Sequence, residues 1–262
     1  AFCKLSPALV SQVLRLLERK KLIVRTTDEK DTRAKCVVLT NDGERRVEKA
    51  AGMLEAVDDQ FFFVDNGDCP VCGVAFEYLR IRTRGLRPAQ RDSDLRVSYT
   101  TSDPTWYALI VCPTCSYTSY HDDFDVMEVD ERERLAAATE ERRTVASKPL
   151  TGHRSAEDAD LALELAMHCY ALRRPNERRR AVLLHRRAWL ARATGDTQTE
   201  LKWLGRARDA YQDAYERDPD VSEEGAQRAA YLIGDLTLRL GDPRGASRWL
   251  EICAKGAAGD QS

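Results

Sequence analysis

Hydrophobic positions near the start of the chain recur at helical spacing. Ser6-Pro7 joins an N-cap residue to a proline at the first helical position, which is a helix-start signal. The positions that follow predict an amphipathic helix that runs to about Lys20, and its apolar members are Leu9, Val10, Val13, Leu14, Leu16 and Leu17. Two short strands, 22–25 and 35–39, are predicted next, around a charged hairpin tip. A further helix is predicted after Gly43, ending at Phe61-Phe62-Phe63.

The second half of the chain also carries apolar residues at helical spacing. Five helices are predicted there: Ala159 to Leu172, Arg178 to Thr194, Glu200 to Glu216, Glu223 to Leu240 and Pro243 to Ala254. Gly195-Asp196 and Gly241-Asp242 end two of them in the same way. These units resemble degenerate tetratricopeptide (TPR) repeats, which implies antiparallel helix pairs with a concave surface for a protein or peptide partner.

Between these halves lie two cysteine pairs, Cys69-Pro-Val-Cys72 and Cys112-Pro-Thr-Cys115, separated by 39 residues. Two such turns supply the four thiolates of a closed tetrahedral zinc site, so we expect one structural zinc ion. A redox pair and buried thiols are the alternatives. Neither alternative explains why the same spacing and the same proline occur in both pairs. Strands are expected at 74–82 and 106–111, leaving one knuckle and entering the other, as in a zinc ribbon. Asn66-Gly67-Asp68 is expected to be a turn at the domain boundary.

The predicted fold class is therefore α+β, with several domains. A partial winged helix occupies 1–65, a zinc ribbon 66–125, an acidic helix and linker 126–155, and TPR-like helical hairpins 156–262.

Charge is segregated along the chain, although the formal net charge is only -2. Residues 1–50 carry 12 Lys and Arg against 7 Asp and Glu, so a polyanion would bind at this end. No apolar run approaches the length of a membrane span, and no secretory signal pattern is present. Because zinc ligation needs reduced thiols, we expect a cytoplasmic protein with no membrane partner.

The N-terminal segment resembles the MarR family of bacterial transcription regulators. The similarity covers residues 3–63 and rests on L-S-P-A-L-V-S-Q-V-L-R-L-L-E-R-K-K-L-I-V-R, then D-E-K-D-T-R-A, then L-T-N-D-G-E. It implies a winged helix that binds double-stranded DNA, with a recognition helix from Ser6 to Lys20 and a wing arginine oriented by Asp31. The implied contacts are Ser6, Pro7, Ser11, Gln12, Arg15, Arg25, Lys30, Arg33 and Lys35. An ordinary solvated helix face is the alternative for the helix taken alone.

This sequence departs from the MarR pattern, because the family's first helices and dimerisation helices are not found in it. We therefore expect apolar faces of the recognition helix to be exposed, and upstream sequence to be missing. A homodimer is left open.

Residues 68–255 resemble an uncharacterised bacterial family with paired C-P-x-C knuckles and a TPR-like tail. The shared motifs are C-P-V-C-G, R-D-S-D-L, Y-x-L-I-V-C-P-T-C-S-Y and the D-D-F run at Asp122 to Phe124. Where that pattern has glycine after the second knuckle, this chain has Ser116, which should strain a left-handed turn by about 1 kcal/mol.

No sequence motif indicates catalysis, and the scattered histidines His121, His153, His168 and His185 suggest no triad. Two functions remain. The first is a MarR-type DNA-binding regulator with a zinc ribbon and an interaction tail, and it is slightly favoured because only the winged-helix half carries a recognisable activity. The second is a zinc-ribbon and TPR-like scaffold with an incidental winged-helix segment. Seven arginines between Arg173 and Arg187 suit acidic ligands, although a solvated helix face explains them more simply.

Overall fold

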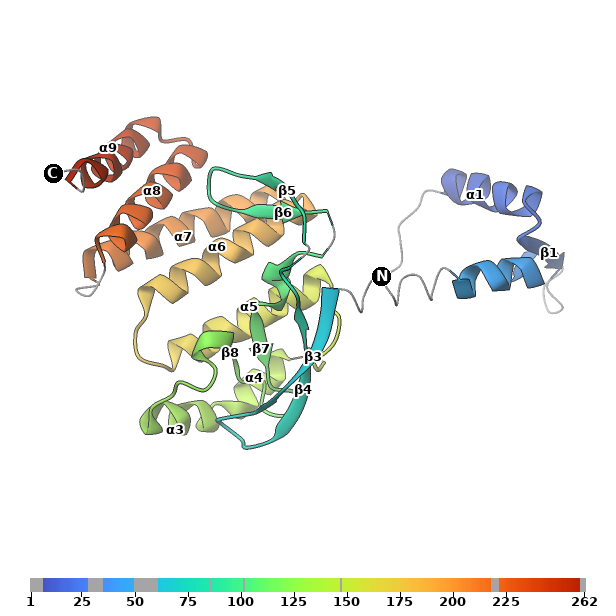
Figure 1. Cartoon of the computed structure of the whole chain (residues 1–262), viewed down its shortest axis with the longest axis horizontal. Helices are drawn as coiled ribbons and strands as arrows, with labels where there is room; N and C mark the ends of the chain where they lie inside the picture. Colours follow the sequence, from blue (N-terminus) through green and yellow to red (C-terminus); the bar gives the residue numbers. More distant parts are fainter. Residues whose placement is uncertain are drawn as a thin grey trace. The chain divides into compact units, whose positions relative to one another are not determined.

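A computed structural model gives the fold of the chain (Figure 1). The structure describes residues 7–27, 35–49, 61–84, 86–100, 102–146, 148–217 and 222–259. The chain forms two compact units, Ala1–Phe61 and Phe62–Ser262, which we call the N-terminal unit and the body.

The N-terminal unit contains the predicted helix and hairpin. Helix α1 (Pro7–Arg19) is followed by strands β1 (Ile23–Thr27) and β2 (Lys35–Leu39), which pair antiparallel, and residues 41–49 are helical. Thr40 links these elements, since its hydroxyl donates to the Lys21 carbonyl and accepts from the Gly43 amide. A Cβ atom at Gly43 would lie 2.1 Å from the Leu22 carbonyl oxygen, so only glycine fits there.

Apolar side chains remain exposed in this unit, as the sequence predicted for the recognition helix. Val13 and Leu16 on α1 are 40% and 43% exposed, and Val38 on β2 is 48% exposed. Ile23 is the only residue among the unit's described hydrophobic side chains that is buried. The unit therefore has little core of its own among its described residues.

The body begins with strands joined in pairs. Strand β3 (Phe62–Asp68) pairs with β4 (Ala75–Ile81), β5 (Pro88–Arg91) with β6 (Val97–Tyr99), and β7 (Leu109–Val111) with β8 (Thr118–Tyr120), all antiparallel. Two 3₁₀ turns, η1 (Pro104–Tyr107) and η2 (His121–Asp123), flank the last pair. Each described cysteine pair therefore lies at the tip of a hairpin.

Two expectations about these strands are wrong. Asn66-Gly67-Asp68 is not a turn but the end of β3, where Asn66 pairs with Glu77 of β4. Trp106 and Tyr107 lie in η1 rather than in a strand, because Asp103 caps that turn ahead of Pro104. In both cases cross-strand pairing or capping overrides local propensity.

The helix expected after Gly43 is described at residues 41–49 and again at Phe61. Strand β3 begins at Phe62, within the Phe61-Phe62-Phe63 run where the helix is expected to end. The buried ring of Phe62 contacts Tyr107 and His153 edge-on.

Helices complete the body. The acidic segment folds as α3 (Val129–Ala137) and α4 (Thr139–Val145), followed by α5 (Ala156–Ala171), α6 (Glu177–Thr194), α7 (Thr197–Arg217), α8 (Glu223–Arg239) and α9 (Pro243–Gly259). The last five lie within a few residues of their predicted bounds. Consecutive members of α5 to α9 pack against one another, and we call α5–α9 the helical tail (Figure 1).

One core layer joins the strands to the tail. Leu109 and Val111 of β7 pack with Leu163 and Ala166 of α5. A second cluster surrounds the cysteines, and a third lies within α6, α7 and α8. The knuckle at the β7–β8 tip is thereby fixed against the tail. No helix in the described part of the chain is long and apolar enough to cross a membrane.

Candidate functional site: a four-cysteine centre

The two cysteine turns have the same backbone hydrogen bonds. In the first knuckle the Gly73 amide donates to the Cys69 carbonyl, and the Cys69 amide donates to Val74. In the second, the Ser116 amide donates to the Cys112 carbonyl, and the Cys112 amide donates to Tyr117. Both turns close through a left-handed residue, Gly73 with φ 72° and Ser116 with φ 55°. Repetition of one turn at two hairpin tips brings four sulfurs to a common point.

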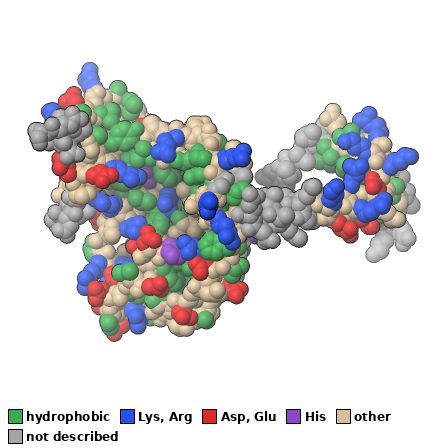
Figure 2. Space-filling model, in the orientation of Figure 1, with side chains coloured by type: hydrophobic (Ala, Val, Ile, Leu, Met, Phe, Trp, Pro, Cys, Tyr) green, Lys and Arg blue, Asp and Glu red, His purple; other side chains and the backbone are tan. Residues whose placement is uncertain are grey.

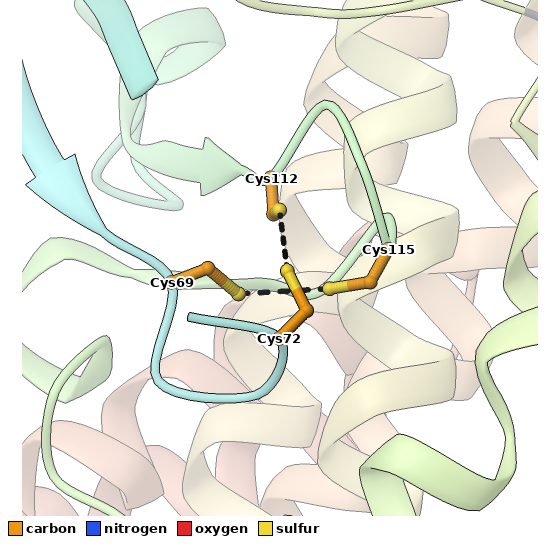
Figure 3. A group of neighbouring side chains, drawn as sticks. All are labelled: Cys69, Cys72, Cys112 and Cys115. Carbon is orange, nitrogen blue, oxygen red and sulfur yellow. Dashed lines mark hydrogen bonds between the residues drawn. The ribbon is translucent and has the colours of Figure 1, made fainter. Parts of the chain in front are cut away.

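The four thiols converge from two loops (Figure 3). The Sγ atoms of Cys69 and Cys115 are 3.5 Å apart, those of Cys72 and Cys112 are 3.7 Å apart, and all four lie within 4.8 Å of one another. Cys69, Cys112 and Cys115 are buried, Cys72 is exposed, and none of the four is in a disulfide. The sequence-predicted set is thus brought together completely, and it can hold one metal ion.

Packing four thiols together shifts their proton affinities in opposite directions. Hydrogen bonding to Cys112 raises the pKa of Cys69 and of Cys115, whereas hydrogen bonds from Cys115 and Cys69 lower the pKa of Cys112. The neighbours therefore stabilise the thiolate of Cys112 and disfavour the thiolates of Cys69 and Cys115. A cation among the sulfurs would stabilise all four thiolates together.

Helix α4 places arginines against the second knuckle, which sequence reasoning missed. Arg142 is 1% exposed, and its Nε donates to the Cys115 carbonyl at 3.2 Å. Arg143 Nε donates to the Thr114 carbonyl at 2.9 Å. Among the described residues no carboxylate pairs with Arg142, whose buried Nη1 has no hydrogen-bond partner, and burial of an unpaired guanidinium costs free energy that a nearby negative charge offsets. A metal tetrathiolate would carry that charge.

Helices α5 and α6 contact the same hairpin and the residues that follow it. The Thr118 amide donates to Cys169 Sγ at 3.3 Å, and Tyr170 donates to Asp123 at 2.5 Å. Asp123 also forms an ion pair with Arg179 at 2.9 Å. Phe124 is 3% exposed and lies against the ring of Tyr117. The D-D-F run is therefore a contact between the second knuckle and the tail.

A second polar cluster lies where the β5–β6 tip meets the helical tail. Asp94, in the D-S-D-L motif, is fully buried, and its carboxylate accepts from Arg192 Nη2 at 2.6 Å and Trp189 Nε1 at 3.1 Å. His185 Nε2 lies 3.4 Å from the same carboxylate. From α8, Tyr231 donates to the Ser93 carbonyl at 2.8 Å. We call this contact the Asp94 clamp.

Electrostatics explain why a buried carboxylate is tolerated there. Burial opposes ionisation of Asp94, but hydrogen bonds from His185 and Arg192 hold its pKa far below the usual range. Burial lowers the pKa of His185 and outweighs the opposing effect of Asp94. A neutral His185 donates from Nε2 to Asp94, which leaves Nδ1 to accept from the Tyr211 hydroxyl at 3.4 Å. The sequence flagged D-S-D-L as a motif, but nothing in it linked Asp94 to His185.

The implied DNA contacts belong to the N-terminal unit and are separate from these clusters. Ser11, Gln12 and Arg15 are exposed on α1, whereas Arg25 on β1 forms an ion pair with Glu18 at 3.3 Å. The backbones of Pro7 and Lys35 begin α1 and β2. Ser6, Lys30 and Arg33, with the side chains of Pro7 and Lys35, lie outside the described residues. Figure 2 shows Lys and Arg side chains gathered on the visible face of this unit.

Comparison with known protein families finds one family that matches the body. The model of a family described as "Uncharacterized protein conserved in bacteria (DUF2225)" matches residues 62–261. The chain belongs to this family. The DUF2225 match begins at the same residue as the body, and it includes both cysteine pairs, the D-S-D-L tip and the helical tail. No curated protein and no solved structure matches the chain. The MarR resemblance of the N-terminal unit stays a prediction.

Proposed function

We propose that the body is a non-enzymatic binding module held together by one structural zinc ion, with the helical tail as its partner-binding part. The observation that carries this proposal is the closed cluster of four cysteine sulfurs. It lies between two hairpins, one of which is fixed to the tail. A partner protein or peptide would then meet a surface whose shape depends on the metal.

Zinc fits the geometry and the ligand type of the cluster. A tetrahedron with Zn–S bonds of about 2.3 Å has S···S edges of about 3.8 Å. Two of the Sγ–Sγ distances, 3.5 and 3.7 Å, are close to that edge, and all four sulfurs lie within 4.8 Å of one another. Four soft thiolates in a tetrahedral set favour zinc over oxygen-seeking cations such as Mg²⁺ or Ca²⁺.

A structural role follows from the ligand set. A catalytic zinc keeps one position for water or substrate, whereas four protein sulfurs leave none. When bound, the ion would supply cross-linking between hairpins rather than a Lewis acid for a reaction. Cys69 and Cys72 would anchor the β3–β4 hairpin, and Cys112 and Cys115 would anchor the β7–β8 hairpin.

Metal analysis and unfolding test this role. We expect about one zinc per chain, and loss of both zinc and cooperative unfolding of the body in Cys112→Ser, because structural zinc contributes folding free energy directly. Cys253→Ser is the matched control, since Cys253 lies on α9 and outside the cluster. A native chain that unfolds identically with and without metal would exclude the proposal.

The partner-binding role has its own test. Proteins that cross-link to the helical tail of the native chain should also cross-link to the Cys253→Ser variant. They should no longer cross-link to the Cys112→Ser variant. Capture of the same proteins by a metal-free Cys112→Ser chain would separate partner binding from the zinc centre.

DNA binding by the N-terminal unit is a second proposal, supported by a different observation. Ser11, Gln12 and Arg15 lie exposed on α1, a helix that leads directly into the β1–β2 hairpin. Short polar side chains and an arginine on an exposed helix suit contacts with base edges and phosphates in a major groove. The chain would then be a regulator whose body binds the partner.

Duplex-DNA binding at fixed low salt tests this second role. Native chain should bind with affinity that falls as salt rises, and Arg15→Ala and Arg33→Ala should each weaken binding. Arg45→Ala is the control, because this exposed arginine lies on the helical stretch 41–49 and pairs with Asp42. Equal losses in Arg15→Ala and Arg45→Ala would indicate only non-specific attraction, and no salt-dependent binding would exclude the role.

A further inference from the structure

A cavity of about 340 Å³ lies between the β5–β6 tip and helices α6, α7 and α8. Its apolar walls include Leu95 of the tip, Val182 of α6 and Leu232 of α8. The rings of Trp189 and Tyr211 add aromatic surface. The volume falls in the range of small-molecule sites, which are mostly apolar with a few polar groups that orient the ligand.

The polar groups at this cavity are mainly cationic. Among the described residues that line it, Arg178, Arg186 and Arg228 are cationic and Asp94 is acidic. The Asp94 carboxylate is already neutralised by Arg192, at 2.6 Å, within the clamp. The described lining thus combines arginine side chains with an apolar floor, and Arg186 and Arg228 are the cations on which the argument rests.

Arg186 is the lining residue whose polar atoms lack partners. Its Nε and Nη1 atoms are buried and have no hydrogen-bond partner in the described part of the chain. Its guanidinium carbon lies 4.8 Å from the centre of the Tyr120 ring, a cation–π contact that leaves the N–H groups unsatisfied. These two atoms have almost no accessible surface, so a ligand would meet them only after the Arg186 side chain turned from Tyr120 into the cavity. An anionic acceptor that drew it there would recover the free energy that the unpaired N–H groups cost.

We propose that this cavity binds a small amphipathic anion: an apolar or aromatic body with one anionic head group, which the arginines receive. The apolar walls exclude a bare inorganic anion as the preferred ligand, because it would leave that surface unused. The positive charge disfavours a neutral or cationic ligand of the same shape. This site lies on the helical tail and is distinct from the four-cysteine centre.

Isothermal titration calorimetry of the full-length chain with 2-naphthoate and with octanoate tests the proposal. At least one of the two should bind saturably with one site per chain. The neutral amide of that ligand should bind at least about tenfold more weakly, and inorganic phosphate should not compete, since an ionic hydrogen bond and apolar contact are both required. Arg186→Gln should weaken binding of the anion about tenfold or more and leave the amide unchanged.

Two further variants keep the result interpretable if Arg186→Gln folds poorly. Ala229→Trp should abolish binding, because Ala229 lines the cavity on α8 and the larger ring would fill it. Arg244→Gln, an exposed arginine on α9 away from the cavity, should bind like the native chain. The proposal is overturned if neither carboxylate binds saturably, if the amide or phosphate binds equally well, or if Ala229→Trp retains full affinity.

Discussion

At the scale of single residues, the second knuckle contains a backbone conformation that its side chain disfavours. Ser116 adopts a φ of 55°, where the equivalent residue of the first knuckle is Gly73. A Cβ atom in the left-handed region costs about 1–2 kcal/mol, and the greater freedom of glycine in the unfolded chain offsets part of this. The positive φ of Ser116 confirms that the strained turn lies where the sequence predicted it.

Ser116→Gly should raise the free energy of unfolding of the body by up to about 1 kcal/mol. Urea denaturation of the zinc-loaded chain measures this. Thr114→Gly, an exposed change in the same turn at a residue without positive φ, should lower it instead. A lower stability in both variants would show that the Ser116 side chain contributes more than its backbone conformation costs.

Asp94 is the residue on which the clamp depends. Asp94→Asn should destabilise the body by about 3 kcal/mol, because it removes the carboxylate that neutralises Arg192 and accepts from neutral His185. The urea midpoint of the zinc-loaded chain reports the loss. Asp122→Asn, whose side chain is 88% exposed, should leave the midpoint unchanged. An unchanged midpoint in Asp94→Asn would mean that Asp92 and Glu200 satisfy Arg192 without Asp94.

The residue scale also shows what the sequence could and could not predict about the candidate site. The cysteine pairs were predictable, since each is a short local motif with its own turn geometry. Asp94 and His185 were not, because they are 91 positions apart and meet only when the β5–β6 tip contacts α6. Arg142 reaches Cys115 across 27 positions for the same reason. Long-range pairs between ordinary residue types leave no local pattern.

At the scale of elements, Gly43 determines how the helical stretch 41–49 approaches the hairpin. Gly43→Ala should loosen the N-terminal unit, since the added Cβ would lie 2.1 Å from the Leu22 carbonyl oxygen and the backbone would have to separate. Hydrogen–deuterium exchange should then be faster in peptides from 15–49 and unchanged in peptides from the body.

Gly152→Ala is the control for that exchange experiment, because no atom lies within 4 Å of the position a Cβ would take there. Unchanged exchange in Gly43→Ala would show that the close approach at Leu22 is not maintained in solution.

Helices and strands differed in how well the sequence predicted them. The tail helices were predictable because apolar residues recur along them with a 3.6-residue period, as in the buried stripe of Ala207, Tyr211 and Ala214 on α7. Strand β3 was not, since Asn66, Gly67 and Asp68 favour turns locally. Their register opposite Glu77, Phe76 and Ala75 makes them a strand. Strand formation depends on a partner that a local pattern does not reveal.

At the scale of the whole molecule, the clamp predicts how stability depends on pH. Burial lowers the pKa of His185 below its usual value of 6.5. The unfolded chain therefore takes up this proton at a higher pH than the folded chain. Stability from the neutral imidazole is complete above pH 6.5 and falls with acidification by at most about 1.4 kcal/mol per pH unit.

Urea denaturation at about pH 7.5 and about pH 5.5 should show this fall in the native chain. His185→Gln should be less stable at the higher pH and should lose less on acidification. The cysteine thiols contribute equally to the pH dependence of unfolding in the two proteins, so their contribution cancels in the comparison. Parallel decreases in the two proteins would assign the pH dependence to other groups.

The D-S-D-L tip lies in the chain between the two cysteine pairs and is bound at its far end by the tail. If zinc binding fixes the position of that loop, it also fixes Asp94 and Leu95 in the wall of the cavity. Zinc and the cavity ligand would then favour the same position of the loop. Thermodynamic reciprocity requires each of the two to tighten binding of the other by the same factor. An anion bound in the cavity would then slow the loss of zinc to a chelator, so the rate of zinc loss from the four cysteines would reveal whether the cavity is occupied.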